Sequence, residues 1–190
     1  MKKPLFVVLV LLPSIMFSQN LIEDNFPTND GYIYYSEVVT LDSSLTANNL
    51  YLNAKKWLVD AFKSSKAVIQ ADDKEAKLII IKSYVSKGHN QYISNPKNWF
   101  TLKIEMKDGR YKYSLYDVRY EFDVYVSGVH NHTDEPFEVW IKPSDKKISE
   151  KKRQKINEAL TKYCKELNVE FKGIISSLKK GMENIENDDW

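Results

Sequence analysis

The strongest pattern in the sequence is an alternation of apolar and polar residues on both sides of Asp108-Gly109. Apolar side chains occupy the even positions of residues 100–106 and the odd positions of residues 111–115. Asp-Gly favours a two-residue type I′ turn, in which both central residues have positive φ. We therefore predict a β-hairpin with one buried face. Its predicted pairs are Met106 with Tyr111, Ile104 with Tyr113 and Leu102 with Leu115.

The alternation changes phase once beyond this hairpin. Apolar residues occupy odd positions up to Leu115 but even positions from Tyr116 to Val126. A slip of one residue would turn every later side chain to the wrong face of the sheet. One extra residue absorbs such a slip, so we predict a β-bulge or a sharp bend at Leu115/Tyr116.

Two segments show the helical period instead. In residues 50–62 and 156–178, apolar side chains recur at spacings of three and four, which is typical of a helix that packs by one face. The second pattern predicts a long helix over residues 149–180. Cys164 lies on its apolar face, and we expect a small buried side chain there rather than a nucleophile.

Shorter segments complete the pattern. The run 78–81 is apolar without alternation, which is typical of a strand covered on both faces. Residues 86–97 and 127–136 are polar and predict loops. The remaining predicted strands are residues 32–41, 67–70, 78–85 and 137–141.

The N-terminus has the composition of a secretory signal peptide. Lys2 and Lys3 precede an apolar run from Leu5 to Phe17, and polar residues follow it. Because a bilayer-spanning helix needs about 20 apolar residues, this run predicts a cleaved leader over residues 1–19. No cysteine stands at its exit for lipid attachment. We expect an exported protein, either periplasmic or secreted.

Loss of a leader of 19 residues from the 190 would leave 171, a length that fits one domain. We expect a mobile lead-in over residues 20–31, a single α+β domain over residues 32–181 and an acidic tail over residues 182–190. Two of the 28 lysines and arginines lie in the leader, so the mature chain has 26 basic and 26 acidic residues. A neutral chain has no overall field that attracts nucleic acid, and export separates it from DNA and RNA.

Three segments carry a resemblance to a known family. Their sequences are YSEVV at residues 35–39, LYLNAKKWL at residues 50–58 and IEMKDGRYKY at residues 104–113. Together they resemble exported bacterial proteins known only as a domain of unknown function with a TATA-binding-protein-like fold. The resemblance implies a curved antiparallel sheet with two helices packed on one face, in the order β-α-β4/5-α. It implies no catalytic or binding residues, and the fold name does not imply DNA binding.

Two histidines are weak candidates for a metal site. His130 and His132 stand two positions apart and can face one ion from an extended segment, with Asp134 and Glu135 completing its ligands. A metal-dependent hydrolase is the corresponding hypothesis. The alternative is a solvated loop, because no third histidine has a ligand-like spacing. We expect no metal and no cofactor.

Aromatic and basic residues supply candidates for binding. If two helices cover one sheet face, the other face is available to a partner protein, a second copy or an apolar molecule. The basic run over residues 146–155 is either a contact for anionic lipids and wall polymers or a solvated face. The candidate residues for a ligand or interaction face are Tyr111, Tyr113, Tyr116, Tyr120 and Tyr125, although aromatic residues in strands more often pack on a half-buried sheet.

The functional hypothesis we favour is a non-catalytic module of the bacterial envelope that works through the uncovered sheet face. Its partner would be another protein or a second copy. A carrier of small apolar molecules or lipids is the alternative, because a long helix lying in a curved sheet is also the helix-grip layout. No nucleophile elbow, phosphate-binding loop or zinc-binding helix motif is present, so we expect no enzyme.

Overall fold

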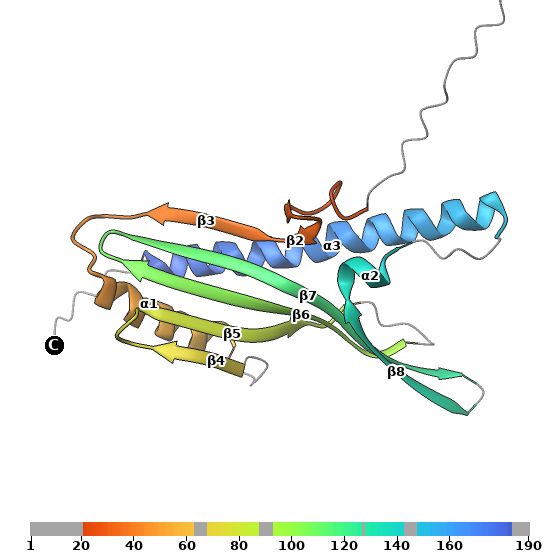
Figure 1. Cartoon of the computed structure of the whole chain (residues 1–190), viewed down its shortest axis with the longest axis horizontal. Coiled ribbons are helices and arrows are strands. Elements are labelled where there is room, and N and C mark those ends of the chain that lie inside the picture. Colours follow the sequence, from red (N-terminus) through yellow and green to blue (C-terminus); the bar gives the residue numbers. More distant parts are fainter. Residues whose placement is uncertain (1–20, 63–67, 88–92, 127, 143–147, 184–190) are drawn as a thin grey trace, which may run out of the picture.

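The structure is a computed structural model and describes residues 21–62, 68–87, 93–126, 128–142 and 148–183 (Figure 1). These residues form a mixed α+β fold, as the sequence predicts. Its strands are β1 (Thr28–Asn29), β2 (Tyr32–Ile33), β3 (Tyr35–Thr40), β4 (Val68–Asp73), β5 (Leu78–Val85), β6 (Ile93–Lys107), β7 (Arg110–Val126) and β8 (Val129–Pro136). Its helices are α1 (Ala47–Ala61), α2 (Phe137–Trp140) and α3 (Glu150–Met182).

The main sheet is antiparallel and has the order β3-β7-β6-β5-β4. Strand β8 pairs with the second half of β7, where β3 no longer accompanies it. The predicted hairpin register is confirmed, including Met106 opposite Tyr111 and Leu102 opposite Leu115. The turn differs from type I′, because Gly109 has a φ of 67° whereas Asp108 is not among the positive-φ residues.

The predicted β-bulge is present and lies slightly later than expected. The register of β7 against β6 gains one residue between Tyr116 and Arg119. Asp117 has a φ of 53° there, a conformation that Asp tolerates better than most side chains. A second bulge lies in β6 at Asn95, whose φ is 49°. Both bulges bend the long β6–β7 ribbon and keep its apolar side chains on one face.

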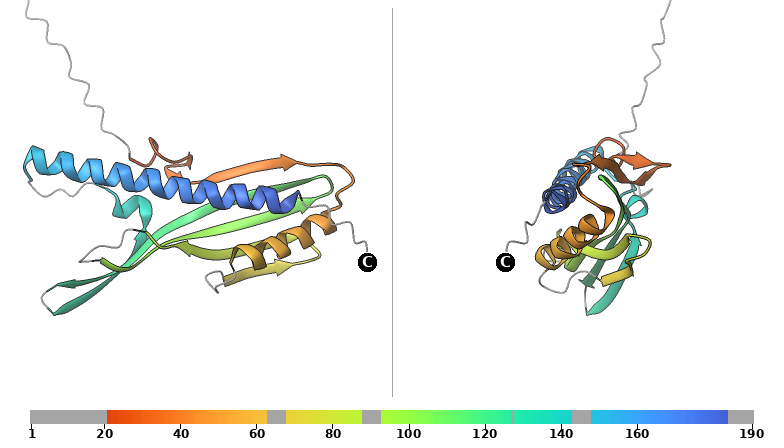
Figure 2. Two further views of the ribbon diagram at one scale, coloured as in Figure 1. Left: turned by 180° about the vertical axis from the view of Figure 1, so that it is seen from behind. Right: turned by 90° about the vertical axis from the view of Figure 1, so that its left-hand side faces the viewer.

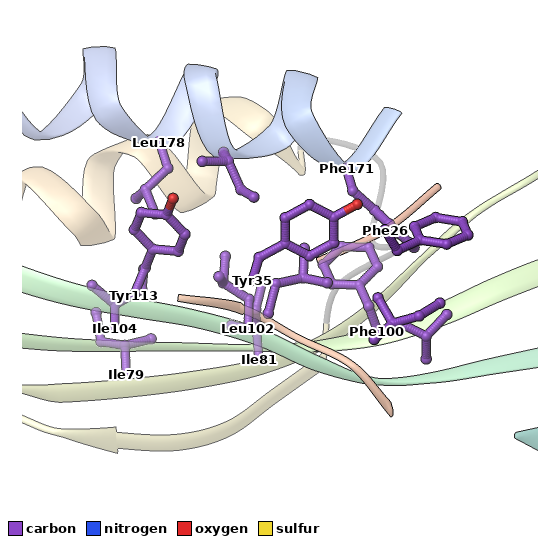
Figure 3. Packing of buried hydrophobic residues seen from close by; sticks show 14 of the residues in the cluster. Phe26, Tyr35, Ile79, Ile81, Phe100, Leu102, Ile104, Tyr113, Phe171 and Leu178 are labelled. Carbon is purple, nitrogen blue, oxygen red and sulfur yellow. The ribbon is translucent and has the colours of Figure 1, made fainter. Parts of the chain in front are cut away.

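Helices α1 and α3 both pack on one face of the sheet, as predicted (Figure 2). Alternate side chains of β5, β6 and β7 meet them from below, so a continuous apolar core fills the space between the layers (Figure 3). Phe171 of α3 meets Tyr35 and Phe100 edge to face, with ring centroids 6.0 and 5.6 Å apart. Each such pair contributes about 0.5–1.5 kcal/mol to stability, in addition to the contribution from burying the rings.

The two helices are in close contact at Trp57 of α1. Its indole nitrogen donates a hydrogen bond of 3.0 Å to the hydroxyl of Ser177 in α3. Gly181 lies against the same side chain, and a Cβ placed there would stand 2.8 Å from the Cβ and Cδ1 of Trp57. Glycine at this position therefore allows α3 to pack closely on α1.

Residues 20–31 differ from the predicted mobile lead-in. Beyond residue 20, which the structure does not describe, the side chains of Leu21, Ile22 and Phe26 are buried in the core. Phe26 meets Phe137 of α2 edge to face at 5.9 Å. These three apolar residues anchor the segment in the core. The sequence did not indicate this, because three residues separated by polar ones are too few to form a periodic pattern.

Two predictions for residues 127–141 were wrong. Residues 129–136 form strand β8 rather than a loop, and residues 137–141 hold the short helix α2 and its end rather than a strand. Strand β8 has no buried apolar face, because it pairs with β7 beyond the cover of α1 and α3. Helix α2 has four residues, which is too short for a helical period.

Three smaller predictions also need correction. The predicted loop 86–97 ends early, because β6 begins at Ile93. The run 78–81 is not covered on both faces, since Ile79 and Ile81 are buried but Leu78 and Ile80 are only half-buried. Met182 is buried in α3, so the acidic tail does not begin before Glu183.

Helix α3 confirms the long helix, although its first turns differ from the predicted apolar face. Cys164 and Leu167 are fully buried, whereas Ile156 is 41% exposed. The first turns of α3 extend past α2 (Figure 1). Within the described residues, no helix has the length and hydropathy needed to cross a membrane.

Candidate functional site on the uncovered sheet face

The sheet face opposite α1 and α3 carries the side chains that alternate with the core. On β6 the core side includes Phe100 and Leu102, so Trp99 and Lys103 point to the other side. Unlike the core face, this surface is a mixture of aromatic and charged side chains, most of them half-buried. We call it the uncovered face.

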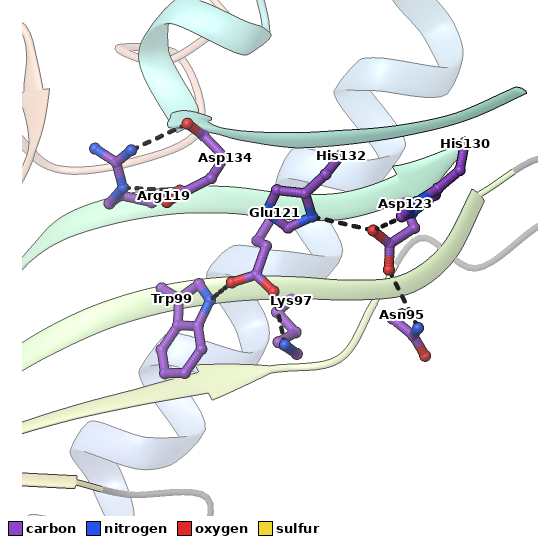
Figure 4. A network of polar contacts seen from close by, with 9 residues as sticks. All are labelled: Asn95, Lys97, Trp99, Arg119, Glu121, Asp123, His130, His132 and Asp134. Atoms are coloured by element: carbon purple, nitrogen blue, oxygen red, sulfur yellow. Dashed lines mark hydrogen bonds and ion pairs between the residues drawn. The ribbon is translucent and has the colours of Figure 1, made fainter. Parts of the chain in front are cut away.

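An aromatic and charged cluster occupies the uncovered face where β5, β6 and β7 run together (Figure 4). Trp99 and Tyr84 are cross-strand partners whose ring centroids lie 4.8 Å apart. The indole nitrogen of Trp99 donates a hydrogen bond of 2.6 Å to Glu121. Lys97 forms an ion pair of 2.7 Å with the same carboxylate and lies 5.6 Å from the centres of both rings. We call Lys82, Tyr84, Lys97, Trp99 and Glu121 the Trp99 cluster.

The contacts of Glu121 keep it ionised. Partial burial opposes its charge, but the hydrogen bonds from Lys97 and Trp99 prevail and lower the pKa of the carboxyl. On the other side of Trp99, the Lys82 amine lies 5.7 Å from the centre of the indole ring. The cluster is therefore a Trp–Tyr pair flanked by two lysines and tied to β7 by one carboxylate.

Two further ion pairs lie on the uncovered face. Lys103 and Glu105 form an ion pair of 2.9 Å along β6. Arg119 of β7 binds both the carboxylate and the backbone carbonyl of Asp134 in β8, at 2.9 and 3.1 Å. Because cations and carboxylates alternate and neutralise each other, this face is not suited to a polyanion.

The two candidate histidines lie on β8 and converge on one carboxylate (Figure 4). His130 Nε2 and His132 Nδ1 each lie 3.0 Å from Oδ1 of Asp123 in β7. Asn95 donates a hydrogen bond of 3.2 Å to the other oxygen. These contacts, first that of His132 and then those of His130 and Asn95, lower the pKa of Asp123 to about 2.

This histidine cluster differs from the candidate metal site that was weighed from the sequence, for which we expected no metal. Asp134 binds Arg119, and Asp123, which sequence reasoning did not select, takes its place beside the histidines. Among the described residues, no group of three or more His, Cys, Asp or Glu side chains is arranged to hold a metal ion. The arrangement is accounted for as a cross-strand hydrogen-bond network that fastens β8 to β7.

The five candidate tyrosines do not share one exposed face. Tyr111, Tyr113 and Tyr120 point toward the helices and are buried in the core. Tyr116 lies on the uncovered face beside Tyr34, at a ring distance of 6.3 Å. Tyr125 is exposed near the end of β7 and stacks on His130 at 4.6 Å. The β-bulge at Asp117 separates them, because it reverses which positions face the core.

Comparison with known proteins places this fold. Residues 35–121 match the family described as a domain of unknown function (DUF4468) with TBP-like fold. The matched segment, 87 of the 190 residues, is similar to a DUF4468 domain. No curated protein matches the chain. The DUF4468 match includes β3, α1 and the Trp99 cluster and ends within β7.

Two crystal structures of bacterial proteins share the architecture of this chain. A TBP-like protein from Parabacteroides distasonis is 14% identical, with a TM-score of 0.63, and the match covers 84% of this chain and 98% of that chain. A DUF4468 family protein from Bacteroides ovatus is 15% identical, with a TM-score of 0.56, and the match covers 86% and 93% respectively. At these identities the likeness shows the fold alone.

The described part of the chain offers no observation in favour of a carrier. Side chains fill the space between α3 and the sheet. A hollow of about 740 Å³ lies along the outer side of α3 and is lined by polar residues of that helix only. A second hollow, of about 70 Å³, lies beside Trp57. Neither has the apolar lining that a buried lipid chain needs.

The basic run is described only in part. Lys146 and Lys147 lie outside the described residues. Its remaining members, Lys151, Lys152, Arg153 and Lys155, are exposed on the first turns of α3. Contact with an anionic surface stays a prediction.

Proposed function

We propose that this protein is an exported, non-catalytic binding module of the bacterial envelope and that its uncovered face contacts a partner protein. The observation that carries the proposal is the Trp99 cluster on the face that α1 and α3 leave open. Trp and Tyr are enriched at protein interfaces and are among the residues that dominate their binding energy. Paired charges surround the cluster, as in the polar rim of such an interface.

The ionisable groups near the cluster favour binding over catalysis. A general acid or base works best when its pKa lies near the operating pH. The pKa of Asp123 is about 2 and that of Glu121 is also lowered, so both stay ionised at neutral pH. Cys164 is buried in the core, and burial raises the pKa of its thiol to about 12. These groups are suited to structural contacts.

The export part of the proposal rests on the N-terminal composition. Residues 1–20 lie outside the described part of the structure, so the predicted leader remains an expectation. A cell fractionation with N-terminal sequencing of the recovered protein tests it. Recovery of the protein in the cytoplasm with residues 1–19 intact would contradict export.

The binding surface is tested by capture from an envelope extract of the source bacterium. The bait is the mature protein, and the variants are Trp99→Ala and Lys82→Glu. Val59→Ser is the matched control, because Val59 is 69% exposed on α1, on the opposite side of the molecule. We expect mass spectrometry to find a partner with the wild type and with the control but not with the two variants.

The captured protein is then purified and its affinity measured by calorimetry. A central interface Trp contributes at least about 2 kcal/mol, so Trp99→Ala should weaken binding by roughly 30-fold. The melting temperature of each variant shows whether it is folded. Equal affinity of the wild type and both variants would refute the uncovered face as the binding surface.

A further inference from the structure

The free edges of the sheet are protected in different ways, and one edge is not protected. Strand β4 has a register shift after Ile69 and ends in Asp72-Asp73. The start of β6, before the part that pairs with β5, has a bulge at Asn95 followed by Pro96. Strand β8 carries charged residues and ends at Pro136. Bulges, charges and prolines at edges all prevent pairing with another chain.

Strand β3 is the exception among these described edges. It pairs regularly with β7 over all six residues, from Tyr35 to Thr40, without a bulge. It contains neither lysine nor proline, and its one charged residue, Glu37, is bound by Lys179 and Tyr113 on the helix side. Val38 is 56% exposed on the uncovered face. In the described part of the chain, no ribbon lies beside the outer edge of residues 36–40 (Figure 1).

The hydrogen bonds at the two ends of β3 show which backbone groups point outward. The N–H of Leu41 donates to the carbonyl of Gly109, so the odd-numbered residues of β3 bind β7. The N–H of Tyr34 donates away from β7, to the carbonyl of Pro27. Because successive residues alternate, the N–H and C=O groups of Ser36, Val38 and Thr40 point outward.

These outward groups determine how two copies can pair. In an antiparallel pair related by a twofold axis, outward residues must meet outward residues. Centring the axis on Val38 places Val38 opposite its own copy and Ser36 opposite Thr40 of the partner subunit. This register uses the whole free edge, forms about six backbone hydrogen bonds and brings the two exposed Val38 side chains together. It places Glu37 opposite Val39 of the partner subunit, so like charges do not face each other.

We infer that two copies of this chain associate through antiparallel pairing of their β3 edges, centred on Val38. The pairing joins the two sheets into one and places the two uncovered faces side by side. A single strand edge buries less than the roughly 1,200 Å² of a standard interface, so the dimer is weak. We expect a dissociation constant of about 1–100 μM.

Cysteine crosslinking tests the register. The chain has one cysteine, Cys164, which is buried and does not compete. In a Val38→Cys variant the two new cysteines would have Cα atoms about 5.5 Å apart, within the range of a disulfide. In Ser36→Cys they would stand about 14 Å apart, because four residue steps separate them.

We expect Val38→Cys to form a covalent dimer at least roughly tenfold faster than Ser36→Cys or Thr40→Cys alone under a mild oxidant. An equimolar mixture of Ser36→Cys and Thr40→Cys should crosslink as Val38→Cys does. Crosslinking of Ser36→Cys alone at the rate of Val38→Cys would overturn the inference.

A proline pair tests the edge by analytical ultracentrifugation from about 1 μM to 1 mM. Val38→Pro removes an outward N–H and should abolish the dimer with little change in melting temperature. Val39→Pro removes an N–H that points to β7 and should lower the melting temperature. A wild type that stays monomeric at 1 mM, or a Val38→Pro variant that still dimerises, refutes the inference. Capture of a partner protein through Trp99 does not depend on this result, so the two proposals fail separately.

Discussion

Replacing the two glycines of α3 with alanine tests the contact between the helices. Alanine in a helix interior is more favourable than glycine by about 0.8–1.0 kcal/mol. A methyl group added at Gly173 would meet no described atom within 4 Å apart from the neighbouring turns of α3, so Gly173→Ala should raise the free energy of unfolding by about that amount. At about 2–4 °C per kcal/mol for a chain of this size, the melting temperature should rise by roughly 3 °C.

Gly181→Ala is the same chemical change in a crowded position. The new methyl would stand 2.8 Å from the Cβ and Cδ1 of Trp57 and 2.9 Å from its Cγ. The Cβ of Trp57 does not move when the indole rotates, so rotation of the ring does not remove this contact. Overpacking of this kind costs about 1–3 kcal/mol, which exceeds the gain in helix propensity. We expect a net loss of up to about 2 kcal/mol.

The assay is urea denaturation at 25 °C. Unfolding is monitored by circular dichroism rather than by tryptophan fluorescence, so that a changed environment of Trp57 does not alter the signal. Both variants should unfold with the wild-type m-value, because neither changes the surface exposed on unfolding. The two midpoints should move in opposite directions. If Gly181→Ala is as stable as Gly173→Ala, the close approach of α3 to Trp57 is refuted.

The other predictions concern buried hydroxyls, one carboxylate and the cysteine. Among the described residues Tyr111 has no hydrogen-bond partner for its buried hydroxyl, so Tyr111→Phe should leave the free energy of unfolding unchanged or raise it. Tyr163→Phe breaks a 2.7 Å hydrogen bond to buried Asn98. It should lower the free energy of unfolding, measured by urea titration, by about 1–2 kcal/mol. The pKa of Asp123 is about 2, below the roughly 3.9 of an unfolded Asp, so its contribution is complete above about pH 4 and is lost as the pH falls toward 2. As the pH falls from 5 to 2, the free energy of unfolding of the wild type should approach that of Asp123→Asn. A difference between the two that stays constant over this range would contradict the prediction. The thiol of Cys164 should react with an aromatic disulfide only as fast as the protein unfolds, because burial raises its pKa to about 12.

The hairpin was predictable because two independent signals coincide there. The alternation defines which residues face the core, and Asp108-Gly109 defines where the chain turns. The change of phase predicted the bulge but not its position. Leu115 and Tyr116 are adjacent apolar residues, so the alternation does not show where near them the extra residue lies. The positive φ of Asp117 is a property of the folded backbone that composition does not encode.

Strand β8 was not predictable from periodicity. Its residues are exposed on both sides and gain their order from pairing with β7, so no apolar alternation marks them. The same reasoning explains the tyrosines. Their burial depends on the face to which each position points. Odd positions face the core up to Tyr113 and even positions face it at Tyr120, because the bulge lies between them.

Only part of the Trp99 cluster could be predicted from the sequence. The alternation around Phe100 already places Trp99 opposite the core. The position of Tyr84 beside it depends on the register of β5 against β6, and that of Glu121 depends on the bulge in β7. Long-range register of this kind is determined by the packed structure, so the sequence alone did not show that these side chains meet.

The first residues of the described chain are held by some of its last. The N–H of Ile33 donates to Glu138, 105 residues later, and Asn168 of α3 binds both Tyr35 and the carbonyl of Asn25. The hydrogen bonds of Tyr35 and Asn25 to Asn168 can therefore form only after this part of α3 has been synthesised. Contacts between residues so far apart in sequence make the completion of the fold a late event.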